Sequence, residues 1–82
     1  MNTFKLKILG TDKKIYEGVV ESLTIPGSSG YFGIWANHCP TLTTLGKGLL
    51  TYRDKEGKTN SLNIDNQGFF EFYKNTATVL VE

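Results

Sequence analysis

Apolar residues alternate with polar ones in several short stretches of this chain. Phe4, Leu6 and Ile8 are separated by two lysines, which is the period-two pattern of a strand with one buried face. The other stretches of this type are 15–25, 48–53, 58–64, 69–73 and 76–81. Turn-forming residues separate the stretches, and none of them is suited to a long helix. The sequence therefore predicts an all-β fold of roughly seven to ten short strands, as a sandwich or a barrel.

Several local features refine this prediction. Asp54–Gly57 is expected to close a hairpin with its glycine in the left-handed region, and Lys74-Asn75 is expected to close another. The stretch 15–25 is interpreted as one or two strands, bent by Gly18. At least two of the three phenylalanines in the stretch 69–73 should belong to the core, because the stretch that pairs with it is also apolar.

Length and charge limit the class of protein. The 82 residues predict one domain that spans 1–82, with a modest core. Nine basic and eight acidic residues give a net charge of +1, which argues against a nucleic-acid-binding protein and against a polybasic membrane-surface module. A single cysteine cannot form an internal disulfide.

The run Pro26–Pro40 contains three glycines, two prolines, three aromatics and the only histidine. Glycine reaches positive φ without a steric cost and proline fixes φ, so the backbone here must follow one particular path. We interpret the run as a shaped surface loop that contacts a partner. Gly30 and Gly33 flank Tyr31-Phe32, which predicts a tight turn with positive φ at one or both glycines.

Residues for catalysis are scarce. His38 and Cys39 are adjacent, and neighbours in a strand point to opposite faces, so we expect no nucleophile–base pair and interpret Cys39 as a half-buried filler. One histidine and one cysteine are too few for a zinc site, and the glycine-rich stretch 27–33 lacks the lysine of a phosphate-binding loop. We therefore expect no catalytic residue, no metal, no cofactor and no small-molecule ligand. The aromatics lack the interleaved basic cluster of a nucleic-acid platform.

A longer pattern runs through the middle of the chain: Pro26-Gly27, Gly30, Phe32-Gly33-Ile34, Asn37-His38, Pro40, Leu42-Thr43, Leu45 and Gly48. It is joined by Phe4-x-Leu6-x-Ile8, by residues 13–21 and by Gly68-Phe69-x-Glu71 with Thr78-Val79-Leu80. This pattern resembles the epsilon subunit of F-type ATP synthases, which is called delta in mitochondria. The resemblance covers essentially the whole chain.

The resemblance implies a ten-stranded sandwich of two antiparallel sheets at the foot of a rotating stalk, a subunit that makes and breaks no bonds. Its partners would be the gamma subunit and the ring of c subunits, with the membrane touched only through the ring. Contacts to gamma would come from Gly10, His38 and Thr43. Contacts to the c-ring would come from Ser28, Ser29, Gly30 and Tyr31. Structural turns are expected at Pro26, Gly27, Gly33, Pro40, Gly48 and Gly68.

Several departures from the family pattern bear on these contacts. An acidic residue is common in the family where Tyr31 stands, and alanine is common at Cys39. Typical members also continue into a pair of C-terminal helices to which regulation is attributed. We expect a naturally short member rather than a chain cut from a longer one, and so a subunit that couples without inhibiting and binds no nucleotide. Its expected place is the cytoplasmic face of a bacterial inner membrane, with an organelle membrane as the alternative. The alternative function is a generic β-sandwich binding module for carbohydrate or peptide.

Overall fold

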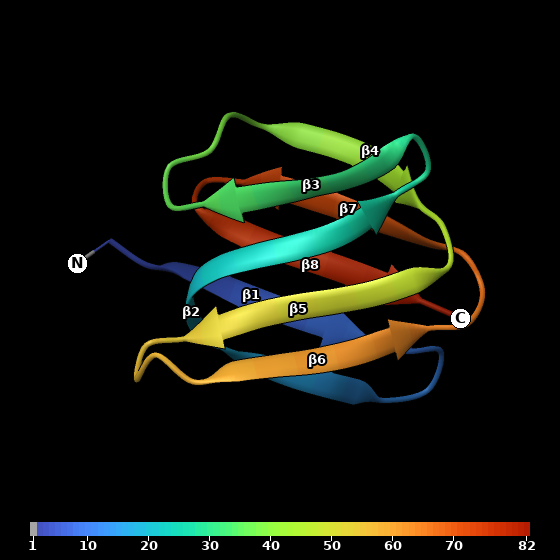
Figure 1. Cartoon of the computed structure of the whole chain (residues 1–82), viewed down its shortest axis with the longest axis horizontal. Helices are drawn as coiled ribbons and strands as arrows, with labels where there is room; N and C mark the ends of the chain where they lie inside the picture. Colours follow the sequence, from blue (N-terminus) through green and yellow to red (C-terminus); the bar gives the residue numbers. More distant parts are fainter. Residues whose placement is uncertain (1) are drawn as a thin grey trace.

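The computed structural model describes residues 2–82, and these residues contain eight strands and no helix (Figure 1). The strands are β1 (Phe4–Leu9), β2 (Lys14–Gly27), β3 (Gly30–Trp35), β4 (Thr41–Leu45), β5 (Gly48–Asp54), β6 (Thr59–Ile64), β7 (Gly68–Tyr73) and β8 (Thr76–Val81). The all-β prediction is confirmed, and the expected stretches coincide with strands. No helix among these residues is long and apolar enough to cross a membrane.

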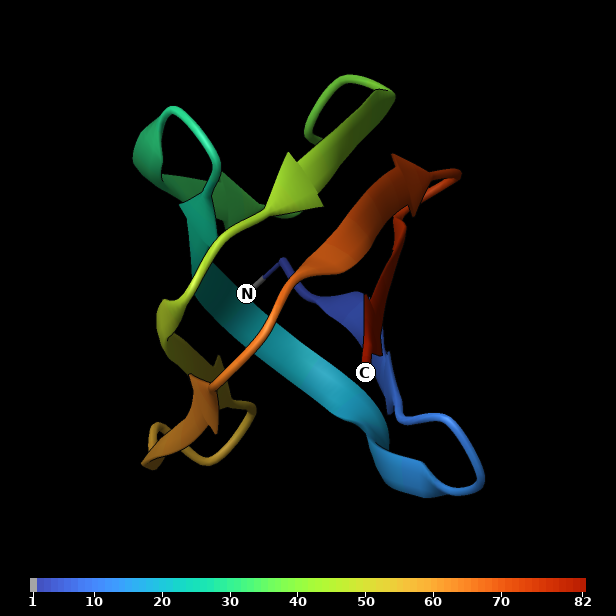
Figure 2. The same cartoon turned by 90° about the vertical axis from the view of Figure 1, so that its right-hand side faces the viewer.

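The strands form two layers that share β2 (Figures 1 and 2). In the first sheet, β1, β8, β7 and β4 lie side by side, and residues 14–20 of β2 pair with β1. In the second sheet, residues 22–27 of β2 lie between β3 and β5, and β6 forms the edge. The expected sandwich is confirmed. The eight strands fall within the predicted seven to ten and roughly match the ten implied by the resemblance, and β2, with 14 residues, serves both sheets as one strand.

The first sheet is mixed rather than purely antiparallel as expected. β1 and β8 pair in parallel, with Lys5 opposite Thr76 and Leu9 opposite Leu80. Parallel neighbours need a long connection between them, and the six intervening strands supply it. All other pairings are antiparallel.

β2 changes sheet at an irregularity between Val20 and Ser22. Its pairing with β1 is regular through Gly18, so the bend predicted at this glycine is not found in that ladder. The extra residue at the irregularity is Glu21, whose Oε1 lies 3.5 Å from Nε of Arg53 on β5. A bulge of this kind increases the local twist of a strand, which lets β2 leave one layer and enter the other.

The core lies between the two sheets and follows the predicted alternation. Phe70 and Phe72 are buried while Phe69 is 56% exposed, which confirms that two of the three phenylalanines face inward. Phe72 packs edge-on against Phe4 with ring centroids 5.5 Å apart. The buried apolar residues are Phe4, Leu6, Ile8, Val20, Leu23, Ile25, Ile34, Leu45, Leu50, Ile64, Phe70, Phe72, Ala77 and Val79.

The two predicted hairpin turns are confirmed. Gly57 has a φ of 85°, and Lys74 and Asn75 have φ values of 49° and 57°. A pair of residues with positive φ matches the right-handed twist of the strands that it joins. Asn75 also ties this end of the molecule together, because its side chain accepts from the N–H of Asn37 at 2.8 Å and donates to the carbonyl of Thr3 at 2.9 Å.

The run Pro26–Pro40 is not one irregular loop. It contains the end of β2, a two-residue turn at Ser28-Ser29, all of β3 and a loop over residues 36–40. Of the two flanking glycines, Gly30 has a positive φ of 135°, whereas Gly33 lies extended within β3. A Cβ at Gly33 would lie 2.6 Å from the indole ring of Trp35, which covers this position and would have to shift.

The other expected turn residues also lie mostly within strands. Pro26 and Gly27 are the last residues of β2, while Gly48 and Gly68 open β5 and β7. Pro40 lies in the loop that leads into β4. In this chain, glycine and proline therefore occur at the ends of strands and at close backbone contacts, and not only in turns.

Gly68 provides the first test of the packing. It is buried, and a Cβ at this position would meet the carbonyl oxygen of Leu80 in the neighbouring strand, a backbone atom that cannot turn away. We expect Gly68→Ala to lower the free energy of unfolding by about 1–3 kcal/mol through overpacking. Gly46→Ala is the matched control, because the nearest atom to its Cβ is 4.0 Å away. Urea denaturation measures both variants, and equal midpoints would contradict the prediction.

Glu17 provides a test of pH dependence. Its carboxylate lies 2.7 Å from Nζ of Lys14 and 3.0 Å from Nζ of Lys5, on the outer face of the first sheet. Hydrogen bonds from Lys14 and then from Lys5 lower the pKa of Glu17 from 4.5 to about 2. Because the folded pKa is lower than the unfolded value, the stabilisation is complete above pH 4.5 and is lost as pH falls toward 2.

We therefore expect Glu17→Gln to flatten the dependence of the urea midpoint on pH between 4.5 and 2. Glu71→Gln, on the same sheet, is the control, since the structure records no ion pair of Glu71 among the described residues. The prediction fails if both variants keep the pH profile of the parent chain.

Candidate interaction surfaces

His38 and Cys39 lie close together, contrary to the prediction that they point to opposite faces. Cys39 Sγ is 3.8 Å from His38 Nδ1, because both residues belong to the loop before β4 rather than to a strand. Cys39 is exposed rather than half-buried. His38 Nδ1 is also 2.9 Å from the carbonyl of Cys39. A carbonyl only accepts, so Nδ1 carries the hydrogen there and cannot take the thiol proton. In that tautomer the histidine nitrogen nearest the thiol is a donor and not a base.

The described residues contain no cluster of three metal-ligating side chains and no buried polar or charged side chain. Candidate functional features in this part of the chain are therefore surfaces. Two of them differ in chemistry: one is a turn at an end of the molecule, and the other is the outer face of the first sheet.

The β2–β3 turn, which we call the tip, brings together the four residues that the resemblance assigns to the c-ring: Ser28, Ser29, Gly30 and Tyr31. All four are exposed at the right-hand end of Figure 1. The tip is tied to β4, since Ser28 N donates to the Thr44 carbonyl at 3.1 Å and the two hydroxyls are 2.7 Å apart. These bonds fix the tip relative to the first sheet.

The tip is uncharged, and it continues into an aromatic edge on the outer face of the second sheet. Tyr31 and Trp35 point outward from β3 and are 59% and 62% exposed. The Tyr31 hydroxyl accepts a hydrogen bond from the N–H of Leu49 at 2.9 Å. Beside Trp35, the Glu21–Arg53 ion pair lines a shallow hollow of about 280 Å³.

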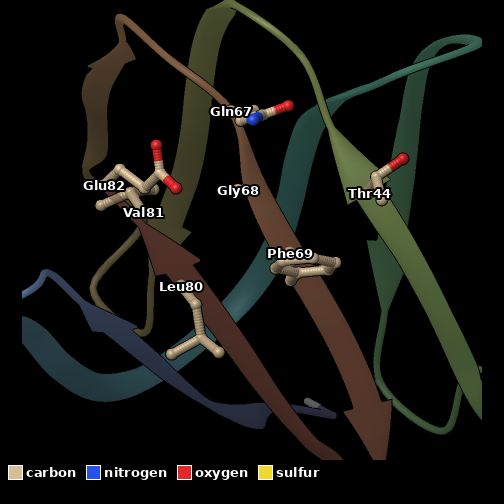
Figure 3. A pocket seen from close by; sticks show the side chains of 7 residues that line it. All are labelled: Thr44, Gln67, Gly68, Phe69, Leu80, Val81 and Glu82. Atoms are coloured by element: carbon tan, nitrogen blue, oxygen red, sulfur yellow. The ribbon is translucent and has the colours of Figure 1, made fainter.

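The outer face of the first sheet is unusually apolar. Leu42 is 77% exposed, and Phe69, Tyr73 and Leu80 are 56%, 54% and 45% exposed. Phe69 and Leu80 are cross-strand partners, and Figure 3 shows their side chains beside a hollow of about 220 Å³ near the last residues of β8. We call Leu42, Phe69, Tyr73 and Leu80 the apolar face. Large exposed apolar patches in soluble proteins mark interaction sites.

Sequence reasoning missed this face. A strand with apolar residues on both faces has the same sequence pattern whether both faces are buried in the domain or one face is exposed and binds a partner protein. The one usable signal was Phe69-Phe70, because adjacent strand residues point to opposite sides and both cannot lie in one core.

The three residues expected to contact gamma are not brought together at one point. His38 lies in the β3–β4 loop at the left of Figure 1, whereas Gly10 lies in the β1–β2 turn at the opposite end. Thr43 is half-buried in β4, between the exposed Leu42 and Thr44. His38 packs edge-on against Phe72 with ring centroids 5.8 Å apart. What the three share is only that they lie in, or next to, strands of the first sheet.

Comparison with known proteins gives the family. A family model described as ATP synthase, Delta/Epsilon chain, beta-sandwich domain matches residues 3–82. The ATP synthase epsilon chain of Leptospira interrogans serovar copenhageni is 40% identical over 81 residues, which are 99% of this chain and 62% of the relative. The ATP synthase epsilon chain of Nitratiruptor sp. is 38% identical over 82 residues, which are 100% of this chain and 63% of the relative. The chain thus spans about three fifths of these relatives.

Solved structures agree on the fold. A chain in the Euglena gracilis mitochondrial ATP synthase superposes with a TM-score of 0.91 at 23% identity, over 99% of this chain and 51% of that one. A chain in the Tetrahymena thermophila mitochondrial ATP synthase central stalk/c-ring gives 0.75 at 15% identity, over 94% of this chain and 61% of that one. With the match over residues 3–82, these findings show that the chain belongs to the family of ATP synthase delta/epsilon chain β-sandwich domains.

Proposed function

We propose that this chain is a rotor component of an F-type ATP synthase that holds the gamma subunit to the c-ring. The observation that supports this role most directly is the apolar face, where Leu42 is 77% exposed although the chain has a well-filled core. Its relatives are named ATP synthase epsilon chains, and the family match covers both this face and the tip. The role is structural, so the catalytic residues of the complex belong to other subunits.

The apolar face is the proposed seat of gamma. An obligate or long-lived contact needs an apolar centre with polar residues around it. Leu42, Phe69 and Leu80 provide the centre, with Thr44 and Glu71 among them. His38 and Gly10 lie in loops at opposite ends of this sheet, where one large partner could reach both, whereas Thr43 pairs with the buried Phe70 and faces the inner side.

The tip is the proposed contact to the c-ring. It lies at one end of the molecule, and its exposed residues Ser29 and Gly30 carry no charge. Contact there would depend on shape and on backbone hydrogen bonds. This arrangement makes the chain a peripheral part of a membrane-bound complex, on the cytoplasmic face in a bacterium, with the membrane touched only through the ring.

A carbohydrate- or peptide-binding module is the second candidate. The hollow beside Trp35 and the Glu21–Arg53 pair favour it, because an exposed indole next to charged groups suits a sugar or a peptide. The indole already covers Gly33 with part of its surface, which leaves less of it for a ligand. Affinity capture from native membranes distinguishes the two functions: a rotor component brings down gamma and the c subunit, and a binding module does not.

Leu42 provides the test of the gamma surface. We expect Leu42→Ser to weaken association with purified gamma by about 1–2 kcal/mol, as for a useful anchor at the centre of an interface. Thermal unfolding should stay close to that of the parent chain, because the side chain is 77% exposed.

The matched control is Leu49→Ser, which removes a 46% exposed leucine from the outer face of the second sheet. A titration of each variant with gamma should separate the two leucines. If both weaken binding equally, or neither does, the apolar face is not the gamma seat.

A further inference from the structure

The ladder between β2 and β5 stops two residues before Pro26. Pairing ends at Thr24 opposite Thr51, although both strands continue. Two residues further in the same register, Pro26 would face Leu49. Proline has no N–H to donate to β5. The Pro26 carbonyl accepts from the Gly46 N–H at 2.9 Å, and the Leu49 N–H bonds to a side chain rather than to the β2 backbone.

The Tyr31 hydroxyl takes that place, with 2.9 Å between it and the Leu49 nitrogen. Tyr31 stands on β3 directly opposite Pro26, so its side chain spans β2 on the outer face of the second sheet to reach β5. The same contact also restricts the residue before Leu49. Gly48 must lack a side chain, because a Cβ there would meet the Tyr31 hydroxyl and would lie 2.8 Å from Pro26 Cβ.

We propose that Tyr31 is a positioning residue, whose hydrogen bond to Leu49 braces the tip against β5 so that Ser29 and Gly30 meet the c-ring in a fixed orientation. The role in docking rests on the proposed function, while the brace itself does not. The tip is then held from both layers: Ser28 ties it to Thr44 of the first sheet, and Tyr31 ties it to the second. A tip that is ordered before contact loses less conformational freedom on binding.

This changes the part that sequence reasoning gave to Tyr31. The Tyr31 hydroxyl points toward β5 of the same chain and already accepts a hydrogen bond from the Leu49 N–H. Direct contact with the ring would come from Ser29 and Gly30. The space beside Gly30 is open, since no atom lies within 4 Å of the position that a Cβ would take. The tyrosine contributes by holding these two residues in place.

Hydrogen exchange in the full chain tests the brace. Tyr31→Phe removes only the hydroxyl, and we expect the Leu49 amide to exchange about fivefold faster, as for the loss of one hydrogen bond. Tyr73→Phe is the control, because the structure records no hydrogen bond of that hydroxyl among the described residues. Unchanged Leu49 exchange in Tyr31→Phe overturns the brace.

Binding to purified, detergent-solubilised c-ring tests the positioning role. Tyr31→Phe should weaken binding roughly threefold to tenfold. Phe4→Leu, which loosens the buried contact between Phe4 and Phe72 far from the tip, should not weaken it, so a general loss of stability is separated from misplacement of the tip. Faster Leu49 exchange with unchanged c-ring affinity overturns the role in docking. If the parent chain itself does not bind the ring, the proposed function fails, and the exchange data still decide whether the brace exists.

Discussion

A single strand, β2, has to pair with four others, and the rest of the sandwich is arranged around this demand. It pairs with β1 over its first half and with β3 and β5 over its second, and a bridge from Gly27 to Leu45 joins it to β4. The bulge at Glu21 lets it change layer, and its ladder with β5 ends two residues before Pro26. Val20, Leu23 and Ile25 keep their side chains inside throughout, so the strand changes sheet without exposing the core. The tip lies at the end of β2, beyond the residues that make all these pairings.

Local sequence patterns predicted the individual strands and turns of this fold well, but they did not predict which distant strands pair with each other. Alternation located β1, β5, β6, β7 and β8, and turn chemistry located Gly57 and Lys74-Asn75. The sharing of β2 and the parallel pair of β1 with β8 depend on residues far apart in sequence, for which no local signal exists. Gly33 shows a subtler limit: a glycine covered by an indole looks the same in sequence as one required by positive φ.

The surfaces divide in the same way. Sequence placed Ser28–Tyr31 together at a turn, and the structure does bring them together. It could not show that Tyr31 is engaged with Leu49, since that contact crosses an intervening strand. Nor could it separate the apolar face from the core, because burial on one side of a sheet and exposure on the other depend on what covers each layer. One surface is a narrow uncharged turn and the other a broad apolar sheet, and the buried core is continuous beneath both sheets.

The parallel pair of β1 and β8 joins the first strand to the last described one, and this sets when the molecule can be completed during synthesis. β1 emerges from the ribosome with β2 as its only neighbour, and its other edge stays unpaired until residues 76–81 have been made. Until then the nascent chain exposes strand edges that could pair wrongly. With so many contacts between distant residues, closure is expected to be slow, on the order of milliseconds to seconds. Synthesis of the hairpin of β7 and β8 thus supplies the strand that covers the open edge of β1 and ends the period in which this edge can pair wrongly.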